Sequence, residues 1–198
     1  MLPKSTWPFY GKKITSKVSN CLRSGKVNYH TGSNCKKFEV LYAKKFGLKY
    51  CLAVTNGTVA LDIAIRVLEI KSNQTIITTP KSYFSSSSQI LRNNINLVFS
   101  DISLISQNLD PDFLLSKINK DTKAVIFVHL GGNPCGIVEV AKICKKKKIF
   151  LIEDCSQAHG AKINNKYAGS FGDISIWSFC NDKIISTGGE GGMISTNK

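Results

Sequence analysis

Three short polar segments hold the residues best suited to chemistry. The first, 56–58 (Asn-Gly-Thr), ends an apolar run and opens a helical pattern. The second, 154–160 (Asp-Cys-Ser-Gln-Ala-His-Gly), follows another apolar run, and the third, 178–183, sets Lys183 shortly before the glycine cluster 188–192. Amides at a helix start can bind a phosphate, a carboxylate can pair with a ring nitrogen, and a lysine amine can bond to an aldehyde carbon. Pyridoxal 5′-phosphate requires all three from a protein, and we therefore expect that cofactor.

Lys183 is the candidate catalytic lysine. Only the neutral form of an amine attacks an aldehyde, and a lysine released from the cofactor can carry a proton between two carbon atoms. Taken alone, Lys183 would be interpreted as a surface residue, since the chain has 27 Lys and Arg residues. Its place between Ser178 and the glycine cluster favours the catalytic interpretation.

Asp154 is the candidate partner of the pyridine nitrogen, because a carboxylate there keeps the ring protonated and electron-withdrawing. The alternatives are a helix cap or a structural ion pair. Glu153 precedes it in a predicted strand and should point to the opposite face, so the two carboxylates are not expected to form a catalytic pair. Gln157 is placed to hydrogen-bond the phenolic oxygen of the cofactor. His159 either lines the pocket or packs in the core.

Gly57 and Thr58 are candidates for phosphate binding, through backbone amides and the threonine hydroxyl at a helix start. The same three-residue segment is also typical of a turn followed by a helix cap. Ser178 offers a second hydroxyl for the phosphate. Tyr83 or Phe84 either stacks on the cofactor ring or packs in the core.

Strand and helix patterns alternate along the chain. We expect strands over 50–55, 75–79, 96–100, 123–130, 149–153, 174–179 and 193–196. We expect helices over 58–68, 85–92, 111–118 and 138–147, and one ending at Gly47 that buries Phe38, Leu41, Tyr42 and Phe46. The predicted fold class is α/β, a mainly parallel sheet covered by helices on both faces. Because ligands bind at the carboxyl ends of such strands, the candidate residues should converge on one rim.

Composition narrows the class of protein. The 198 residues are 42% hydrophobic and 20% charged, as in ordinary globular domains, and hold no apolar run of membrane-spanning length and no signal-peptide pattern at the start. We therefore expect a cytoplasmic protein. The seven cysteines show no metal-binding spacing, so we expect reduced thiols and no metal. The net charge of +14 is interpreted as a solvated basic face that attracts anionic substrates, since no nucleic-acid recognition module accompanies it.

Taken together, these motifs make the chain resemble the DegT/DnrJ/StrS family of sugar-nucleotide aminotransferases, which are fold-type-I pyridoxal-phosphate enzymes. The resemblance covers nearly the whole chain. It rests on 24–32 with Phe38 and Glu39, 53–61, 128–134, 153–161, 169–173, 178–179 with Lys183, and 189–192.

The resemblance implies a role for each candidate residue. It assigns Lys183 to the covalent bond with the cofactor, Asp154 to the ring nitrogen and Gln157 to the phenolic oxygen. It places Gly57, Thr58 and Ser178 around the phosphate and Phe84 against the ring. It further implies that an amino group is taken from glutamate and placed on a nucleotide-linked keto-sugar, for glycan or surface-polysaccharide synthesis such as that of lipopolysaccharide O-antigen. The active site would be shared within a homodimer, with no nucleic-acid or membrane partner.

The sequence also departs from the family. Residues 180–182 (Cys-Asn-Asp) replace the commoner Tyr-Pro-Thr or Tyr-Pro-Ser before the lysine. Relatives are about twice as long, so we interpret the chain as C-terminally truncated. Residues 1–35 would form an N-terminal helix and active-site loop, and 36–198 part of the cofactor-binding large domain.

Three alternatives remain open at this point. A pyridoxal-dependent sugar dehydratase is one, although some dehydratase relatives carry histidine at the position of Lys183. An inactive fragment or regulatory paralogue that binds only cofactor or sugar is the second. A basic nucleic-acid-binding domain is the third, and it rests on net charge alone.

Overall fold

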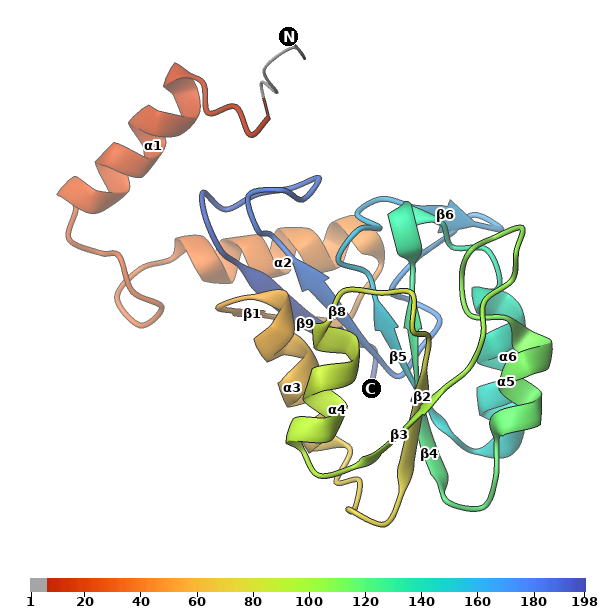
Figure 1. Cartoon of the computed structure of the whole chain (residues 1–198). Coiled ribbons are helices and arrows are strands. Elements are labelled where there is room, and N and C mark those ends of the chain that lie inside the picture. The colour runs from red at the N-terminus through yellow and green to blue at the C-terminus, as the bar shows by residue number, and fades with distance from the viewer. Residues whose placement is uncertain (1–6) are drawn as a thin grey trace, which may run out of the picture.

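A seven-stranded sheet forms the centre of the molecule in the computed structural model, which describes residues 7–198 (Figure 1). Its strands lie in the order β1-β9-β8-β5-β4-β2-β3. The strands are β1 (Tyr50–Val54), β2 (Thr75–Thr78), β3 (Asn96–Phe99), β4 (Thr122–Val128), β5 (Phe150–Asp154), β8 (Ile174–Ser178) and β9 (Gly192–Thr196). The helices are α1 (Lys12–Arg23), α2 (Asn34–Phe46), α3 (Gly57–Val67), α4 (Ser85–Arg92), α5 (Pro111–Lys117) and α6 (Ile137–Lys147).

The sheet is parallel except for β9. Strands β3, β2, β4, β5 and β8 pair in parallel, whereas β9 pairs antiparallel with both β8 and β1. The predicted fold class, a mainly parallel sheet with helices on both faces, is confirmed. The carboxyl ends of six strands therefore lie at the same edge, as the convergence of the candidate residues requires.

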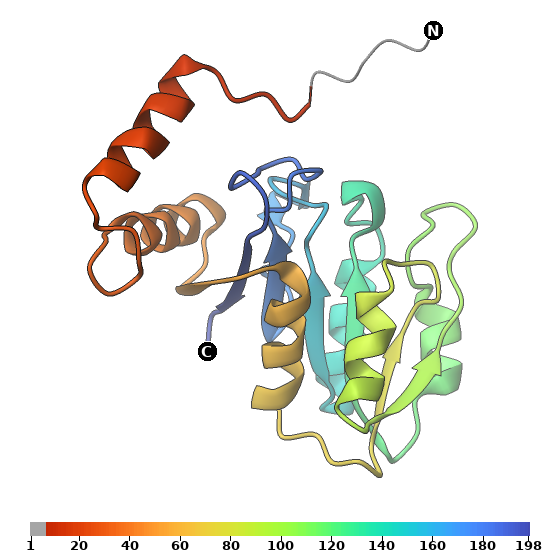
Figure 2. The ribbon, with the colours of Figure 1, turned by 60° about the vertical axis from the view of Figure 1, so that its left-hand side comes forward.

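Helices cover both faces of the sheet (Figure 2). On one face, the apolar sides of α3 and α4 pack on alternate strand residues, including Ile126, Ile152 and Ile176. On the other face, α5 and α6 pack on Val125, Phe127 and neighbours. Helix α2 covers the sheet near β8 and β9, where Tyr42 and Phe46 contact Trp177. Burial on both faces explains why the central strands β4, β5 and β8 are mostly apolar.

Local signals set the helix ends. The side chain of Asn56 accepts a hydrogen bond from the Val59 N–H at 2.9 Å and caps α3. Asp110 caps α5, with Pro111 in its first turn, as predicted. Gly47 ends α2 in the left-handed conformation, with φ of 66°.

Some local expectations were wrong. Leu41 was expected in the buried face of α2 but is 65% exposed, because the helix buries Tyr42 and Phe46 instead. The predicted strand over 123–130 ends at Val128, and Leu130–Gly132 form a 3-10 turn. A hairpin of β6 (Lys162–Ile163) and β7 (Lys166–Tyr167) was not anticipated, although Asn164 and Asn165 between them have the positive φ typical of a tight turn.

Helix α1 stands apart from the rest of the molecule (Figures 1 and 2). None of its residues is buried, and Ile14, Val18 and Leu22 form an exposed apolar stripe. No helix within 7–198 is both long and apolar enough to cross a membrane. The first six residues, where the predicted N-terminal segment begins and where a signal peptide was not expected, lie outside the described part.

Candidate active site

One pocket lies at the carboxyl ends of the strands and holds almost every predicted site residue. Its volume is about 530 Å³, within the usual range for small-molecule sites. The predicted residues that line it are Gly57, Thr58, Asp154, Gln157, Ser178 and Lys183. The convergence on one rim is therefore confirmed for six of the seven predicted residues.

The start of α3 forms one wall of the pocket. The hydrogen bonds at this end are made by the N–H groups of Val59 and Ala60 to Asn56, and within the described chain none uses the N–H of Gly57 or Thr58. These two N–H groups lie at the positive end of an 11-residue helix and can therefore bind an anion. A Cβ atom on Gly57 would lie 3.0 Å from the Cβ of Ser178, so glycine allows this close approach.

Asp154 ends β5 and forms the floor of the pocket on the α3 side of the sheet. The carboxylate is buried and accepts a hydrogen bond from the Ser156 N–H at 3.0 Å. Burial raises the pKa of Asp154 above its usual range, partly offset by Ser156 and by the nearby His129 and Lys183. None of the ion pairs found in residues 7–198 includes Asp154. A buried carboxylate without an adjacent cation favours a ligand that brings a positive charge.

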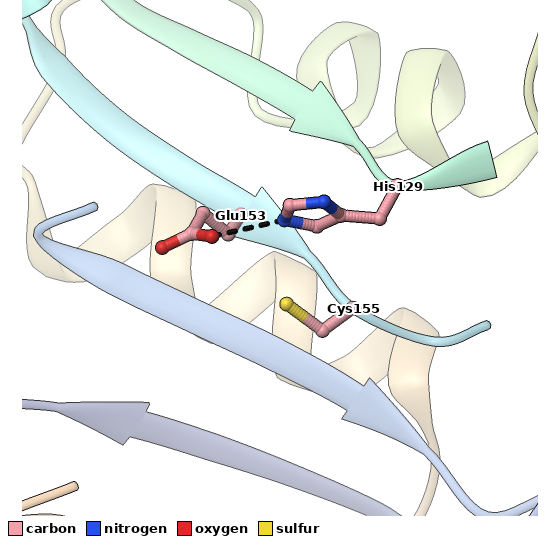
Figure 3. Close-up of side chains that lie close together, drawn as sticks. All are labelled: His129, Glu153 and Cys155. Atoms are coloured by element: carbon pink, nitrogen blue, oxygen red, sulfur yellow. Dashed lines mark hydrogen bonds and ion pairs between the residues drawn. The ribbon is translucent and has the colours of Figure 1, made fainter. Parts of the chain in front are cut away.

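Glu153 points to the opposite face of the sheet, as predicted, and its role is structural (Figure 3). It accepts hydrogen bonds from Phe171 and Gly172 on one oxygen, and from Gly169 and the His129 ring on the other, at 2.6–2.9 Å. Cys155 lies beside them, with ligand-type atoms of Cys155, Glu153 and His129 within 4.8 Å of one another. Because four N–H donors already occupy the carboxylate, this cluster is a hydrogen-bonded network that braces the loop over 169–172.

Gln157 and His159 have different roles in the loop after β5. The Gln157 Oε1 accepts a hydrogen bond from the Gly131 N–H at 2.7 Å, which leaves its amide nitrogen free to donate. His159 does not line the pocket. Its Nε2 donates to the carbonyl of Ser178 at 2.9 Å and its Nδ1 accepts from Tyr42 at 2.7 Å. Burial lowers the pKa of His159, and the half-buried ring packs against Trp177 and Phe179 and anchors the end of β8.

Lys183 reaches the pocket from the loop after β8. Its Nζ lies 2.8 Å from Oδ2 of Asp182, and its side chain is 21% exposed. Cys180, Asn181, Asp182 and Glu190 also line the pocket. Asp182 and Glu190 were not among the predicted site residues. The unusual 180–182 segment was the sequence signal that could have identified Asp182.

Phe84 is the one predicted residue that is not in the pocket. It precedes the first turn of α4 and is 76% exposed, whereas its neighbours Tyr83 and Ser85 line the cavity. Neither aromatic residue packs in the core, because Tyr83 is equally exposed.

The sequence matches one protein family over this whole region. The profile of the DegT/DnrJ/EryC1/StrS aminotransferase family covers residues 8–198. The chain belongs to this family.

Relatives within the family share both sequence and structure with the chain. GDP-perosamine synthase of Escherichia coli O157:H7 is 36% identical over 194 residues, which are 96% of this chain and 53% of that protein. The crystal structure of the aminotransferase from Psychrobacter cryohalolentis has a TM-score of 0.97 at 40% identity, covering 99% of this chain and 50% of that one. E. coli GDP-4-keto-6-deoxy-D-mannose-3-dehydratase with bound hydrated PLP has a TM-score of 0.90 at 30% identity, covering 100% and 51%. The chain thus spans about half the length of these three proteins.

The pocket fits the cofactor that the family implies. The unused amides of Gly57 and Thr58 suit a phosphate, and the buried carboxylate of Asp154 suits a protonated ring nitrogen. The amine of Lys183 lies in the same cavity, where an aldehyde can be reached. These donors, acceptors and charges match pyridoxal 5′-phosphate group by group.

Proposed function

We propose that the protein is a pyridoxal-phosphate-dependent aminotransferase that places an amino group on a nucleotide-linked keto-sugar for surface-polysaccharide synthesis. The observation that carries the proposal is the buried, unpaired carboxylate of Asp154 in one cavity with the amine of Lys183. Membership of the aminotransferase family and the similarity to a GDP-perosamine synthase support the reaction class and the substrate class.

Each residue of the pocket has a distinct task in this proposal. When bound, the cofactor supplies a positively charged ring that withdraws electrons from the substrate carbon. The amides of Gly57 and Thr58 and the hydroxyl of Ser178 hold the phosphate, and Asp154 keeps the ring nitrogen protonated. Gln157, fixed by Gly131, donates its amide N–H to the phenolic oxygen.

Lys183 has two tasks in the proposal. Its amine holds the cofactor covalently between turnovers, and when free it moves a proton at the substrate carbon. Glutamate is the proposed amino donor. Phe84 is the proposed aromatic at the ring face, which requires the segment before α4 to move inward from its exposed position.

Covalent capture of the cofactor tests the assignment. Incubation with pyridoxal 5′-phosphate followed by borohydride should attach one phosphopyridoxyl group, located on Lys183 by peptide mass spectrometry. Lys183→Ala should abolish this adduct, whereas the matched control Lys146→Ala, which changes an exposed lysine of α6, should retain it. An adduct of unchanged yield in Lys183→Ala would refute the assignment.

A sugar dehydratase is the second candidate, because a GDP-sugar dehydratase has the same fold at 30% identity. The two functions differ in their need for an amino donor. With cofactor and a nucleotide-linked keto-sugar, an aminotransferase consumes glutamate and yields an amino-sugar. Loss of a hydroxyl group from the sugar at a rate that does not depend on glutamate would favour the dehydratase.

We further propose a cytoplasmic homodimer in which 36–198 form part of the cofactor-binding domain and 1–35 a separate N-terminal segment. The exposed apolar stripe on α1 supports association, since such surfaces are commonly covered in assemblies. Light scattering coupled to size exclusion should give twice the mass of 21.8 kDa. A single-chain mass at every concentration tested would contradict the dimer for this chain.

A further inference from the structure

The contact between Asp182 and Lys183 is an ion pair inside the candidate active site. Oδ2 of Asp182 lies 2.8 Å from Nζ of Lys183, and both residues line the pocket. Asp182 is 63% exposed and Lys183 is 21% exposed, so the carboxylate lies toward solvent and the amine toward the cavity. The lysine pulls the pKa of Asp182 below its usual value, so this carboxylate is charged at neutral pH.

Other titratable groups surround Lys183 but make other contacts. Asp154 on β5 accepts from Ser156, and Glu190 accepts from the thiol of Cys180 at 3.3 Å. His159 is committed to Tyr42 and the carbonyl of Ser178. Among the described residues, Asp182 is therefore the one carboxylate in direct contact with the amine.

We propose that Asp182 is a positioning residue for Lys183, whose carboxylate pairs with the unbonded amine and holds it at the pocket. An ammonium nitrogen has no free electron pair, so it must release a proton before it can form a bond to carbon. Asp182 thereby sets how readily Lys183 reacts. An effect of Asp182 on the reaction of Lys183 with pyridoxal 5′-phosphate rests on the proposed function. The ion pair itself does not require a cofactor.

Acetylation of the cofactor-free protein measures the availability of the neutral amine directly. Limiting acetic anhydride labels Lys183 and reference lysines such as Lys146, and peptide mass spectrometry gives the ratio of the two in each sample. At neutral pH we expect Asp182→Asn to raise this ratio roughly two- to fivefold, the effect of removing a partly exposed ion pair.

Two variants separate positioning from a change in fold. Asp182→Glu keeps the carboxylate and should restore slow labelling. Asp112→Asn, an exposed carboxylate in the first turn of α5, removes the same charge elsewhere and should leave the ratio unchanged. Equal ratios for the wild type and Asp182→Asn at every pH would overturn the proposal, as would acceleration by Asp154→Asn and not by Asp182→Asn.

Salt provides a test on the unmodified protein. Raising the salt concentration from about 0.05 M to about 1 M should speed labelling of Lys183 in the wild type, since an exposed ion pair is screened. The same change should have little effect in Asp182→Asn, and an equal effect in both would overturn the proposal. If Asp182→Asn accelerates acetylation but no adduct with pyridoxal 5′-phosphate forms, the positioning role stands and the proposed function fails.

Discussion

Asp154 illustrates how a residue can serve a ligand at the expense of stability. Its carboxylate is 6% exposed, and burial raises its pKa. A carboxyl with a raised pKa stabilises the fold fully only below its usual pKa, and this contribution is lost as the pH rises through the folded value. Ionisation of Asp154 in the cofactor-free protein is therefore unfavourable for stability.

We expect Asp154→Asn to stabilise the cofactor-free protein at pH 7. The thermal midpoint should rise by a few °C, the size of a change of about 1 kcal/mol in a chain of this length. The gain should shrink as the pH falls toward about 4, where the wild-type carboxyl is also neutral. Differential scanning calorimetry across this pH range checks both points.

The matched control is Asp112→Asn, which removes an exposed carboxylate and should give no gain at pH 7. A lower thermal midpoint for Asp154→Asn than for the wild type at pH 7 would contradict the interpretation that the buried carboxylate of Asp154 destabilises the cofactor-free protein.

At the level of single residues, the sequence predicted which side chains share the pocket where a motif fixed both residue type and position. Asp154, Gln157 and Lys183 lie in the pocket as expected. Phe84 does not, because the direction of an aromatic side chain before a helix depends on tertiary contacts that a one-dimensional pattern does not contain. The sequence left two options open for His159, and the structure places its half-buried ring outside the pocket, against the core residues Trp177 and Phe179.

At the level of secondary-structure elements, β9 closely approaches the residue that caps α3. A Cβ atom on Gly192, the first residue of β9, would lie 2.3 Å from the carbonyl carbon and oxygen of Asn56. Backbone meets backbone here, so a larger residue cannot be accommodated by rotating a side chain. This junction holds the phosphate-binding end of α3 against the sheet.

We expect Gly192→Ala to destabilise the protein by about 1–3 kcal/mol, the usual effect of overpacking. Gly189→Ala provides the matched control, because a Cβ atom there meets nothing within 4 Å. In urea denaturation, the midpoint of Gly192→Ala should be lower than that of the wild type. The midpoint of Gly189→Ala should be close to that of the wild type. Equal midpoints for the two variants would show that the close approach is not rigid.

At the level of elements, the order of helices and strands was predictable because each carries a clear period and end signal. The predicted helix over 85–92 coincides with α4, and Asp110 caps α5 as expected. The direction of β9 was not predictable, because a buried apolar strand reads the same in either direction. The hairpin of β6 and β7 was missed, since two-residue strands are too short to show alternation.

The whole molecule combines a buried sheet with a peripheral N-terminal helix, and local stability should follow this division. Helix α1 buries none of its 12 residues, whereas α3, of 11 residues, buries five. In monomeric protein, amides of α1 should exchange with deuterium at the earliest times, and those of α3, β4 and β5 much later. Hydrogen-exchange mass spectrometry checks this, and equal protection of α1 and α3 in the monomer would contradict the described packing.

Charge is also a property of the whole chain. The chain has a net charge of +14, whereas its pocket contains the carboxylates of Asp154, Asp182 and Glu190, so long-range attraction for anions is combined with local negative groups. The composition alone predicted the attraction for anions. It gave no information on the carboxylates in the pocket, because the positions of charged side chains are determined by the fold.

The position of β9 affects how the protein is made. Strand β1 is synthesised early, yet within residues 7–198 its only partner in the sheet is β9, which pairs with it residue for residue from Tyr50 with Thr196 to Val54 with Gly192. On the ribosome, the other strands of the described sheet are all made before β9, so β1 cannot form these pairs until residues 192–196 have been synthesised. During that interval the backbone N–H and C=O groups of β1 lack their partners on β9. A chaperone that binds extended apolar segments would bind β1 at this stage.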